Sequence, residues 1–179
     1  MKIFSPLATL LMLASLTGFQ AQAGSRQVID ANGQSQSVPD APRRVVVLSE
    51  LDLDSALTLG VQPVGTVNGR GQSTLPRYLL DKAGKEIAVV GDLDNPNLEK
   101  LIDLEPDLIL TGQTKPELLA LLKEIAPTVV TGNWGEPWKT VFNRSANVMN
   151  KEAEAKAFLA RYDARLAEAR SKLAKHQGE

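Results

Sequence analysis

Apolar residues along the chain switch repeatedly between two periodicities. Short, continuous apolar runs are typical of strands buried on both faces of a parallel sheet, and the segments between them have the three- and four-residue spacing of amphipathic helices. This alternation predicts an α/β fold, a doubly wound, mostly parallel sheet with helices on both faces. The expected strands are residues 45–48, 61–67, 87–90, 108–110 and 128–130, and the expected helices are residues 52–59, with Asp52 as the cap, 75–83, 98–104 and 116–125.

The segment before the first buried strand has a different pattern. Residues 27–38 form two short extended runs around Asn32-Gly33. Both residues tolerate a positive φ, so this dipeptide is a strong signal for a short hairpin. We expect an antiparallel hairpin there.

The last segment predicts one long helix. Residues 151–175 contain no Gly or Pro, and five apolar positions recur at spacings of four, four, three and four. At about 1.5 Å per residue this helix is roughly 37 Å long, more than a small sheet can cover. We expect an α/β lobe over residues 24–148 and a long amphipathic helix over residues 149–179, with a second lobe absent from the sequence. The stripe consists of Phe158, Tyr162, Leu166, Ala169 and Leu173.

The first residues resemble a targeting segment. Met1-Lys2 precedes an uncharged stretch over residues 3–16, and Ala21-Gln22-Ala23 has the small residues that signal peptidase accepts. Fourteen apolar residues span about 21 Å as a helix, less than the roughly 30 Å of a bilayer core. We expect a signal peptide over residues 1–23 and an exported, soluble protein in the periplasm that begins at Gly24. A buried core helix is the alternative.

Composition excludes several classes of function. Lys and Arg number 20 against 21 Asp and Glu, and the chain has no Cys and one His. A near-neutral charge gives no electrostatic basis for binding nucleic acid. Without Cys, and with one His, the chain has no thiol nucleophile, Cys-ligated metal site, or Cys for a lipid anchor after the signal. We therefore expect no resident metal or cofactor.

In a parallel α/β sheet, ligands bind beyond the carboxyl ends of the strands, so the following loops are the candidate site. These loops are residues 49–52, 68–74, 92–97, 111–115 and 132–138. We select seven ligand-binding candidates from these loops and from the expected helix over residues 75–83. They are Ser49, Glu50, Arg70, Tyr78, Thr111, Trp134 and Trp138.

The order of motifs also carries a family resemblance. The hairpin is followed by "APRRVVVLS", "LTLGVQPVGTV", "VVGDLDNPNLEKLIDLEPDLILTG", "KEIAPTVV" and a long Ala-rich helix. Over residues 26–175 this order resembles the N-terminal lobe of periplasmic siderophore- and cobalamin-binding proteins, which serve ATP-driven importers. The resemblance implies two lobes joined by a helix, a ligand held between them, and a binding protein rather than an enzyme. It implies capture of a ferric siderophore and delivery to an inner-membrane ABC permease.

The resemblance suggests roles for the candidate residues. Arg70, between two glycines, would offer a planar cation to an anionic siderophore complex, or is a solvated loop residue. Trp134 and Trp138 would form an aromatic wall, unless one of them packs against the sheet. Tyr78 either lines the cleft or closes the core. Glu99 would dock into an arginine pocket of the permease, or is a surface residue favoured by the helix dipole.

Other functions remain open at this point. A cobalamin- or heme-binding protein of the same class is one alternative, with Tyr78 or Tyr162 as the available heme ligand. A small exported α/β enzyme would depend on the carboxylate pair Asp92 and Asp94, although helix capping also explains both residues. A structural lobe without an activity of its own is the third.

Overall fold

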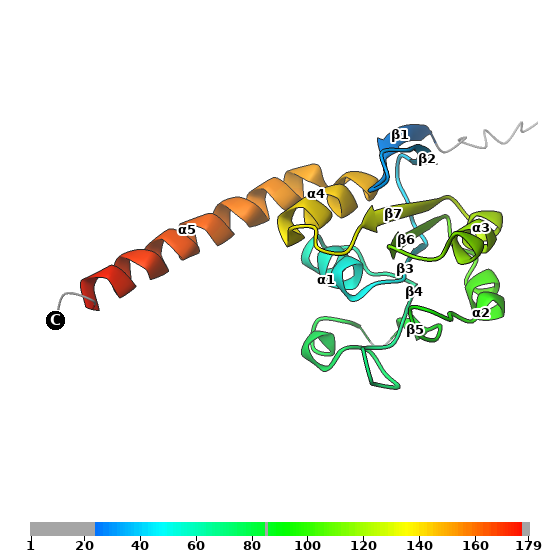
Figure 1. The fold of residues 1–179 in the computed structure, drawn as a ribbon, viewed down its shortest axis with the longest axis horizontal. Helices are drawn as coiled ribbons and strands as arrows, with labels where there is room; N and C mark the ends of the chain where they lie inside the picture. The colour runs from blue at the N-terminus through cyan, green and yellow to red at the C-terminus, as the bar shows by residue number, and fades with distance from the viewer. Residues whose placement is uncertain (1–23, 85, 177–179) are drawn as a thin grey trace, which may run out of the picture.

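The computed structural model describes residues 24–84 and 86–176 (Figure 1), so the expected signal peptide lies outside the described residues. At its centre is a five-stranded sheet in which every neighbouring pair is parallel, in the order β5-β4-β3-β6-β7. This arrangement confirms the predicted doubly wound sheet. The strands are β3 (Val45–Val47), β4 (Gly65–Thr66), β5 (Ala88–Val89), β6 (Leu108–Gly112) and β7 (Thr128–Gly132).

Helices cover both faces of the sheet (Figure 1). One face packs against α1 (Glu50–Thr58) and α4 (Trp138–Val148), and the other against α2 (Leu98–Asp103) and α3 (Pro116–Ile125). Successive side chains of β3 alternate between the two cores, because strand residues point to opposite faces. Val45 and Val47 belong to the first core, and Val46 belongs to the second.

The predicted hairpin is present as β1 (Ser25–Ile29) and β2 (Ser35–Pro39), which pair antiparallel. The Asp30 carboxylate fixes the turn by accepting hydrogen bonds from the backbone N–H groups of Asn32 and Gln34, both at 2.8 Å. Gly33 adopts a φ of 75°, which glycine tolerates without a steric penalty. The Ala31 N–H donates to the Val130 carbonyl oxygen at 2.8 Å, so the hairpin covers the outer edge of β7.

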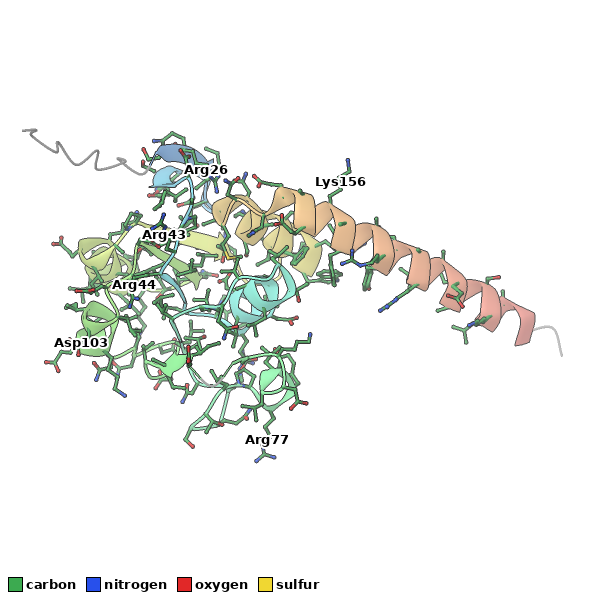
Figure 2. The ribbon with its side chains drawn as sticks, turned by 180° about the vertical axis from the view of Figure 1, so that it is seen from behind. Arg26, Arg43, Arg44, Arg77, Asp103 and Lys156 are labelled. Atoms are coloured by element: carbon green, nitrogen blue, oxygen red, sulfur yellow. The ribbon has the colours of Figure 1, made fainter. Side chains whose placement is uncertain are left out.

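The motif around residues 104–108 is held by the segment before β3. The Asp107 carboxylate accepts the backbone N–H groups of Arg43 and Arg44, at 2.7 and 2.9 Å. The Arg44 guanidinium donates to the carbonyl oxygens of Leu104 and Glu105 just after α2. Figure 2 labels Arg43 and Arg44, together with Asp103 at the end of α2. These contacts satisfy carbonyl groups that a helix end leaves unpaired.

The long helix is also confirmed, as α5 (Glu152–His176), which projects away from the lobe in Figure 1. Its first turns pack on the core through Ala155, Phe158 and Leu159. Farther along, Leu173 is 66% exposed. The apolar stripe is therefore covered only near its start. Within the described residues, no helix is both long and apolar enough to cross a bilayer.

Three elements differ from the expectation. Helix α4 was not predicted, although Val141, Phe142 and Ala146 are buried at helical spacing. The expected helix over residues 75–83 contains only a 3₁₀ turn, η1 (Arg77–Leu79), because Pro76 before it is extended, with a ψ of 127°. The expected strand over residues 61–67 pairs only at β4, and Pro63 has no N–H group to donate there.

Candidate ligand-binding site

The chain leaves the two central strands in opposite directions. Strand β3 is followed by connections toward β4 and β5, and β6 by a connection toward β7 on the other side. Such a switch point opens a crevice at the carboxyl ends of the strands. A cavity of about 850 Å³ lies there, the size expected of a small-molecule site. Loops after all five strands contribute to its lining, which includes Ser49, Glu50, Asn68, Arg70, Gln72, Tyr78, Asp92, Asp94, Gln113, Thr131, Asn133, Trp134 and Glu136.

A polar network begins at two residues of the cavity lining, Ser49 and Thr131, and continues to the buried residues Asp52 and Ser145. We call its four residues, Ser49, Asp52, Thr131 and Ser145, the cleft floor. The Asp52 carboxylate is within hydrogen-bonding distance of the hydroxyl groups of Ser49 (2.6 Å), Thr131 (2.8 Å) and Ser145 (2.7 Å). The network joins the start of α1, the end of β7 and the middle of α4.

Burial dominates the electrostatics of the cleft floor. Asp52 is fully buried, and desolvation raises the pKa of its carboxyl group above the ordinary value, although the three hydroxyl groups partly offset this effect. The sequence predicted Asp52 as the N-cap of α1, and this prediction is wrong. Ser49 is the N-cap, and its hydroxyl oxygen accepts the Asp52 backbone N–H at 3.1 Å. A Ser followed three residues later by an acidic residue is a known capping signature, so the sequence carried this signal.

Three side chains project at the edge of the cavity, and we call Arg70, Tyr78 and Trp134 the cleft rim. Trp134 is 74% exposed and Tyr78 is 64% exposed. The Arg70 backbone N–H donates to the Glu50 carboxylate at 2.7 Å, which holds the loop, while its guanidinium has no hydrogen bond or ion pair to any of the described residues. Partial desolvation, and then the nearby carboxylates of Glu50 and Asp54, raise the pKa of Tyr78, so its phenol remains a neutral hydrogen-bond donor.

The loop that carries Trp134 is held in place. The Glu136 carboxylate accepts the Asn133 N–H at 2.7 Å and the Arg144 guanidinium at 2.9 Å. These hydrogen bonds keep the pKa of Glu136 low. Arg144 also donates to the Thr131 carbonyl oxygen at 2.6 Å, and the Gln113 side-chain oxygen accepts the Trp134 backbone N–H at 3.2 Å. Arg144, which the sequence did not single out, therefore fixes the loop that presents the tryptophan.

The structure brings five of the seven candidates together around the cavity: Ser49, Glu50, Arg70, Tyr78 and Trp134. The other two lie elsewhere. Thr111 is buried in β6, where its carbonyl oxygen accepts the Thr131 hydroxyl at 3.0 Å. Trp138 begins α4 and packs against Phe142 and Tyr162, with ring centroids at 6.2 and 5.1 Å.

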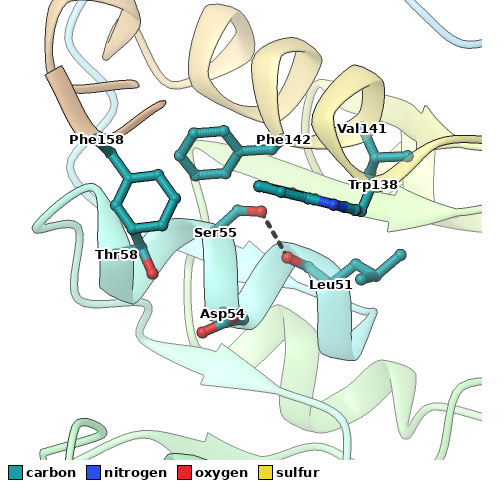
Figure 3. A pocket seen from close by; sticks show the side chains of 8 residues that line it. All are labelled: Leu51, Asp54, Ser55, Thr58, Trp138, Val141, Phe142 and Phe158. Carbon is teal, nitrogen blue, oxygen red and sulfur yellow. Dashed lines mark hydrogen bonds between the residues drawn. The ribbon is translucent and has the colours of Figure 1, made fainter. Parts of the chain in front are cut away.

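Trp138 lines a second, much smaller cavity between α1, α4 and α5 (Figure 3). Its ring lies beside Phe142, and Phe158 from α5 faces the same space. Both tryptophans were predicted as ligand contacts. Trp134 faces the cleft, whereas Trp138 joins an aromatic cluster near the start of α5. The site residues that remain proposed ligand contacts are the five around the larger cavity.

The acidic loop after β5 has a structural explanation. The Asp92 carboxylate accepts the backbone N–H groups of Asp94 and Asn95, at 3.1 and 2.9 Å, and so closes a local turn. Across residues 24–84 and 86–176, no group of three or more His, Cys, Asp or Glu side chains is placed to hold a metal ion. A polar turn accounts for the position of Asp92.

Glu99 lies outside the cavity lining, in the first turn of α2. The Asn97 side chain caps this helix by accepting the Lys100 N–H at 2.9 Å. Glu99 is exposed, so its carboxylate faces solvent at a helix N-terminus, where a negative charge is favourable.

A parallel α/β lobe with a cleft at its switch point and a long helix leaving it has the architecture of one lobe of a solute-binding protein. Comparison with known proteins agrees: the periplasmic binding protein family matches residues 45–179, and the chain belongs to this family. It is 34% identical over 150 residues to the probable siderophore-binding lipoprotein YfiY of Bacillus subtilis, covering 83% of this chain and 46% of that protein.

Solved structures agree with this fold. Staphylococcus aureus SirA complexed with staphyloferrin B superposes with a TM-score of 0.70 at 30% identity, covering 79% of this chain and 48% of that one. The petrobactin-binding protein YclQ from Bacillus subtilis superposes with a TM-score of 0.68 at 28% identity, covering 81% of this chain and 52% of that one. The chain thus spans about half the length of the relatives it matches.

Proposed function

We propose that this chain forms one wall of the ligand site of a substrate-binding protein, which captures a ferric siderophore and delivers it to an inner-membrane ABC permease. The observation that carries the proposal is the cavity of about 850 Å³, with Trp134, Tyr78 and Arg70 exposed at its rim. Large aromatic side chains exposed beside a cavity are suited to binding a bulky ligand. The siderophore-binding relatives support this choice of ligand.

The chemistry of the wall favours iron that arrives already chelated. Free ferric iron would need a cluster of protein ligands, and the described residues offer none. In this proposal the chelator supplies the iron ligands, while Trp134 and Tyr78 contact its carbon framework. Ser49, Glu50 and Arg70 provide polar contacts around it.

Delivery would use a different surface. Glu99 is exposed and outside the cavity lining, so it remains free to contact a permease while the cleft is occupied. We propose that it docks into a basic pocket of that partner. The expected signal peptide would place this encounter in the periplasm.

Nuclear magnetic resonance with gallium(III) complexes tests the proposal, because gallium(III) has the charge of ferric iron and is diamagnetic. The chain has two tryptophans, one at the cleft rim and one outside the cleft. A gallium siderophore should therefore shift the indole N–H signal of Trp134 and leave that of Trp138 unchanged. Trp134→Phe and Trp138→Phe assign the two signals.

One wall supplies only part of the contacts, so we expect weak binding. If a complete site binds near micromolar, about 8 kcal/mol, half of the contacts leave roughly millimolar binding, about 4 kcal/mol. Cobalamin and heme serve as comparison ligands. A larger effect of either one on Trp134, or no effect of any gallium chelate, would contradict the siderophore proposal.

A further inference from the structure

The cavity wall carries an unequal number of charges. Its charged lining residues are four carboxylates, Glu50, Asp92, Asp94 and Glu136, and one guanidinium, Arg70. The carboxylates come from the first turn of α1, which follows the central strand β3, and from the loops after the edge strands β5 and β7, so they are spread across the width of the sheet.

The ion pairs on this wall leave the imbalance in place. Glu136 is paired with Arg144 at 2.9 Å, and this pair is neutral as a unit. Asp92 accepts two backbone N–H groups, which stabilise its charge without cancelling it. Asp94 is exposed and its carboxylate has no partner within the described residues. Three carboxylates therefore face one guanidinium, an excess of two negative charges.

Helix dipoles do not reverse this balance. The N-termini of α1 and α4 are at the cleft and would attract an anion if they were unoccupied. The first turn of α1 already contains Glu50 and Asp52, and Ser49 caps it. Glu136 lies two residues before α4. Carboxylates thus occupy the first turn of α1, whereas the Glu136 carboxylate near α4 is bound by the Asn133 N–H and the Arg144 guanidinium.

The exposed aromatic rings of the wall also favour a cationic ligand over an anionic one. Trp134 and Tyr78 present faces that attract cations, because the ring quadrupole is negative above the plane. From the charge balance, the acidic first turn of α1 and these rings, we infer that the wall selects chelates that are uncharged or carry a cationic arm. This inference rests on the proposed function and names its substrate class: ferric trishydroxamates rather than triscatecholates.

The charge of the two complexes follows from their donor groups. Three hydroxamates each contribute one negative charge and neutralise ferric iron, whereas three catecholates leave the complex with three negative charges. Repulsion by the wall penalises the second complex, and it weakens as salt shortens the Debye length. Arg70 is the one guanidinium among the charged residues of this lining, and the three unpaired carboxylates outnumber it, so we do not expect the wall to act as a receptor for anions.

The experiment titrates the chain with three gallium complexes: a neutral trishydroxamate, a trishydroxamate with a pendant ammonium group, and a triscatecholate. The Trp134 indole signal is the readout, at about 20 mM and about 300 mM salt. At low salt we expect both trishydroxamates to bind at least about tenfold more tightly than the triscatecholate, with a smaller gap at high salt.

Two variants locate the effect. Asp94→Asn should weaken binding of the ammonium-bearing complex by about two- to fivefold and leave the neutral complex unchanged. Asp103→Asn removes an exposed charge from α2, outside the cavity lining (Figure 2), and should change neither. Tighter binding of the triscatecholate, or equal effects of the two variants, would overturn the inference while leaving the siderophore proposal intact. If no chelate shifts Trp134, the proposed function itself fails.

Discussion

The cleft floor and the cleft rim lie on the same cavity, yet their side chains are in opposite situations. In the floor, Asp52 is completely buried, and the hydroxyl groups of Ser49, Thr131 and Ser145 surround it. In the rim, the Trp134 ring is largely exposed. Buried polar groups are costly without partners, whereas exposed ones are solvated at little cost. The floor therefore contributes to stability, and the rim remains available for a ligand.

This difference separates two kinds of variant. A substitution in the floor should change the free energy of unfolding, because it removes buried hydrogen bonds between side chains. A substitution in the rim should change ligand affinity with little effect on stability. The predictions that follow test this separation in order of expected effect.

Removing the central carboxylate should cause the largest loss of stability. Asp52→Ala removes the carboxylate that three hydroxyl groups share, leaves the Thr131 and Ser145 hydroxyl groups only backbone carbonyl acceptors, and opens a small cavity, and we expect a loss of about 3 kcal/mol. Urea denaturation followed by circular dichroism measures it. Asp94→Ala, an exposed control, should change stability by less than about 0.5 kcal/mol. Similar values for the two variants would mean that the network does not stabilise the lobe.

Replacing each of the two tryptophans separately should give the next largest effects. Trp134→Ala should weaken binding of a gallium trishydroxamate about tenfold, about 1.4 kcal/mol, without a measurable change in stability. Trp138→Ala should do the reverse, because it removes contacts with Phe142 and Tyr162, and we expect a loss of about 2 kcal/mol in stability. Backbone amide signals follow the titration of both variants, because Trp134→Ala has no indole signal at the rim, and urea denaturation measures stability. A change in both affinity and stability for either variant would contradict the separation.

The pH dependence of stability gives a test of sign. Burial raises the pKa of Asp52 in the folded state, so the folded protein binds more protons than the unfolded chain between the two pKa values. The contribution of Asp52 to stability is therefore greatest below the unfolded pKa and decreases as pH rises through the folded pKa. Asn cannot titrate, so the stability of Asp52→Asn relative to the native chain should increase with pH over this window.

Urea denaturation of both proteins across the acidic range measures this difference, and carboxyl groups common to both cancel. A difference that stays constant with pH, or that decreases, would contradict a raised pKa. Thr131→Val is a useful companion, because it removes one hydroxyl group from the carboxylate without removing the titrating group.

Much of the fold could be predicted from the sequence because its signals are local. Residues 45–48 and 108–110 are continuous apolar runs, and α5 has a regular spacing over 25 residues. Helix α4 was not predicted, although its buried residues have helical spacing, and the roles of Arg144 and Ser145 on it depend on tertiary contacts. Arg144 reaches Glu136 and β7, and Ser145 reaches Asp52.

The candidate site divides in the same way. The rim residues follow strands, so the rule for parallel sheets identified Arg70, Tyr78 and Trp134. The contacts of Asp52 with Thr131 and Ser145 could not be predicted, because these residues are 79 and 93 positions away from it in the chain. Nothing in the sequence pairs them before the sheet is formed. Trp138 was placed in the cleft because the loop was expected to extend to it, whereas α4 begins at that residue.

The smallest expected effect concerns Glu99, which belongs to neither the floor nor the rim. Glu99→Ala should change the affinity for a gallium trishydroxamate by less than about twofold and stability by about 0.5 kcal/mol at most, the value of a charge near a helix N-terminus. Asp103→Ala, on the same helix, is the matched control. Only Glu99→Ala should reduce binding to membrane vesicles that contain the cognate permease, since docking depends on that carboxylate. An affinity loss as large as that of Trp134→Ala would place Glu99 in the cleft and remove the reason for assigning it to docking.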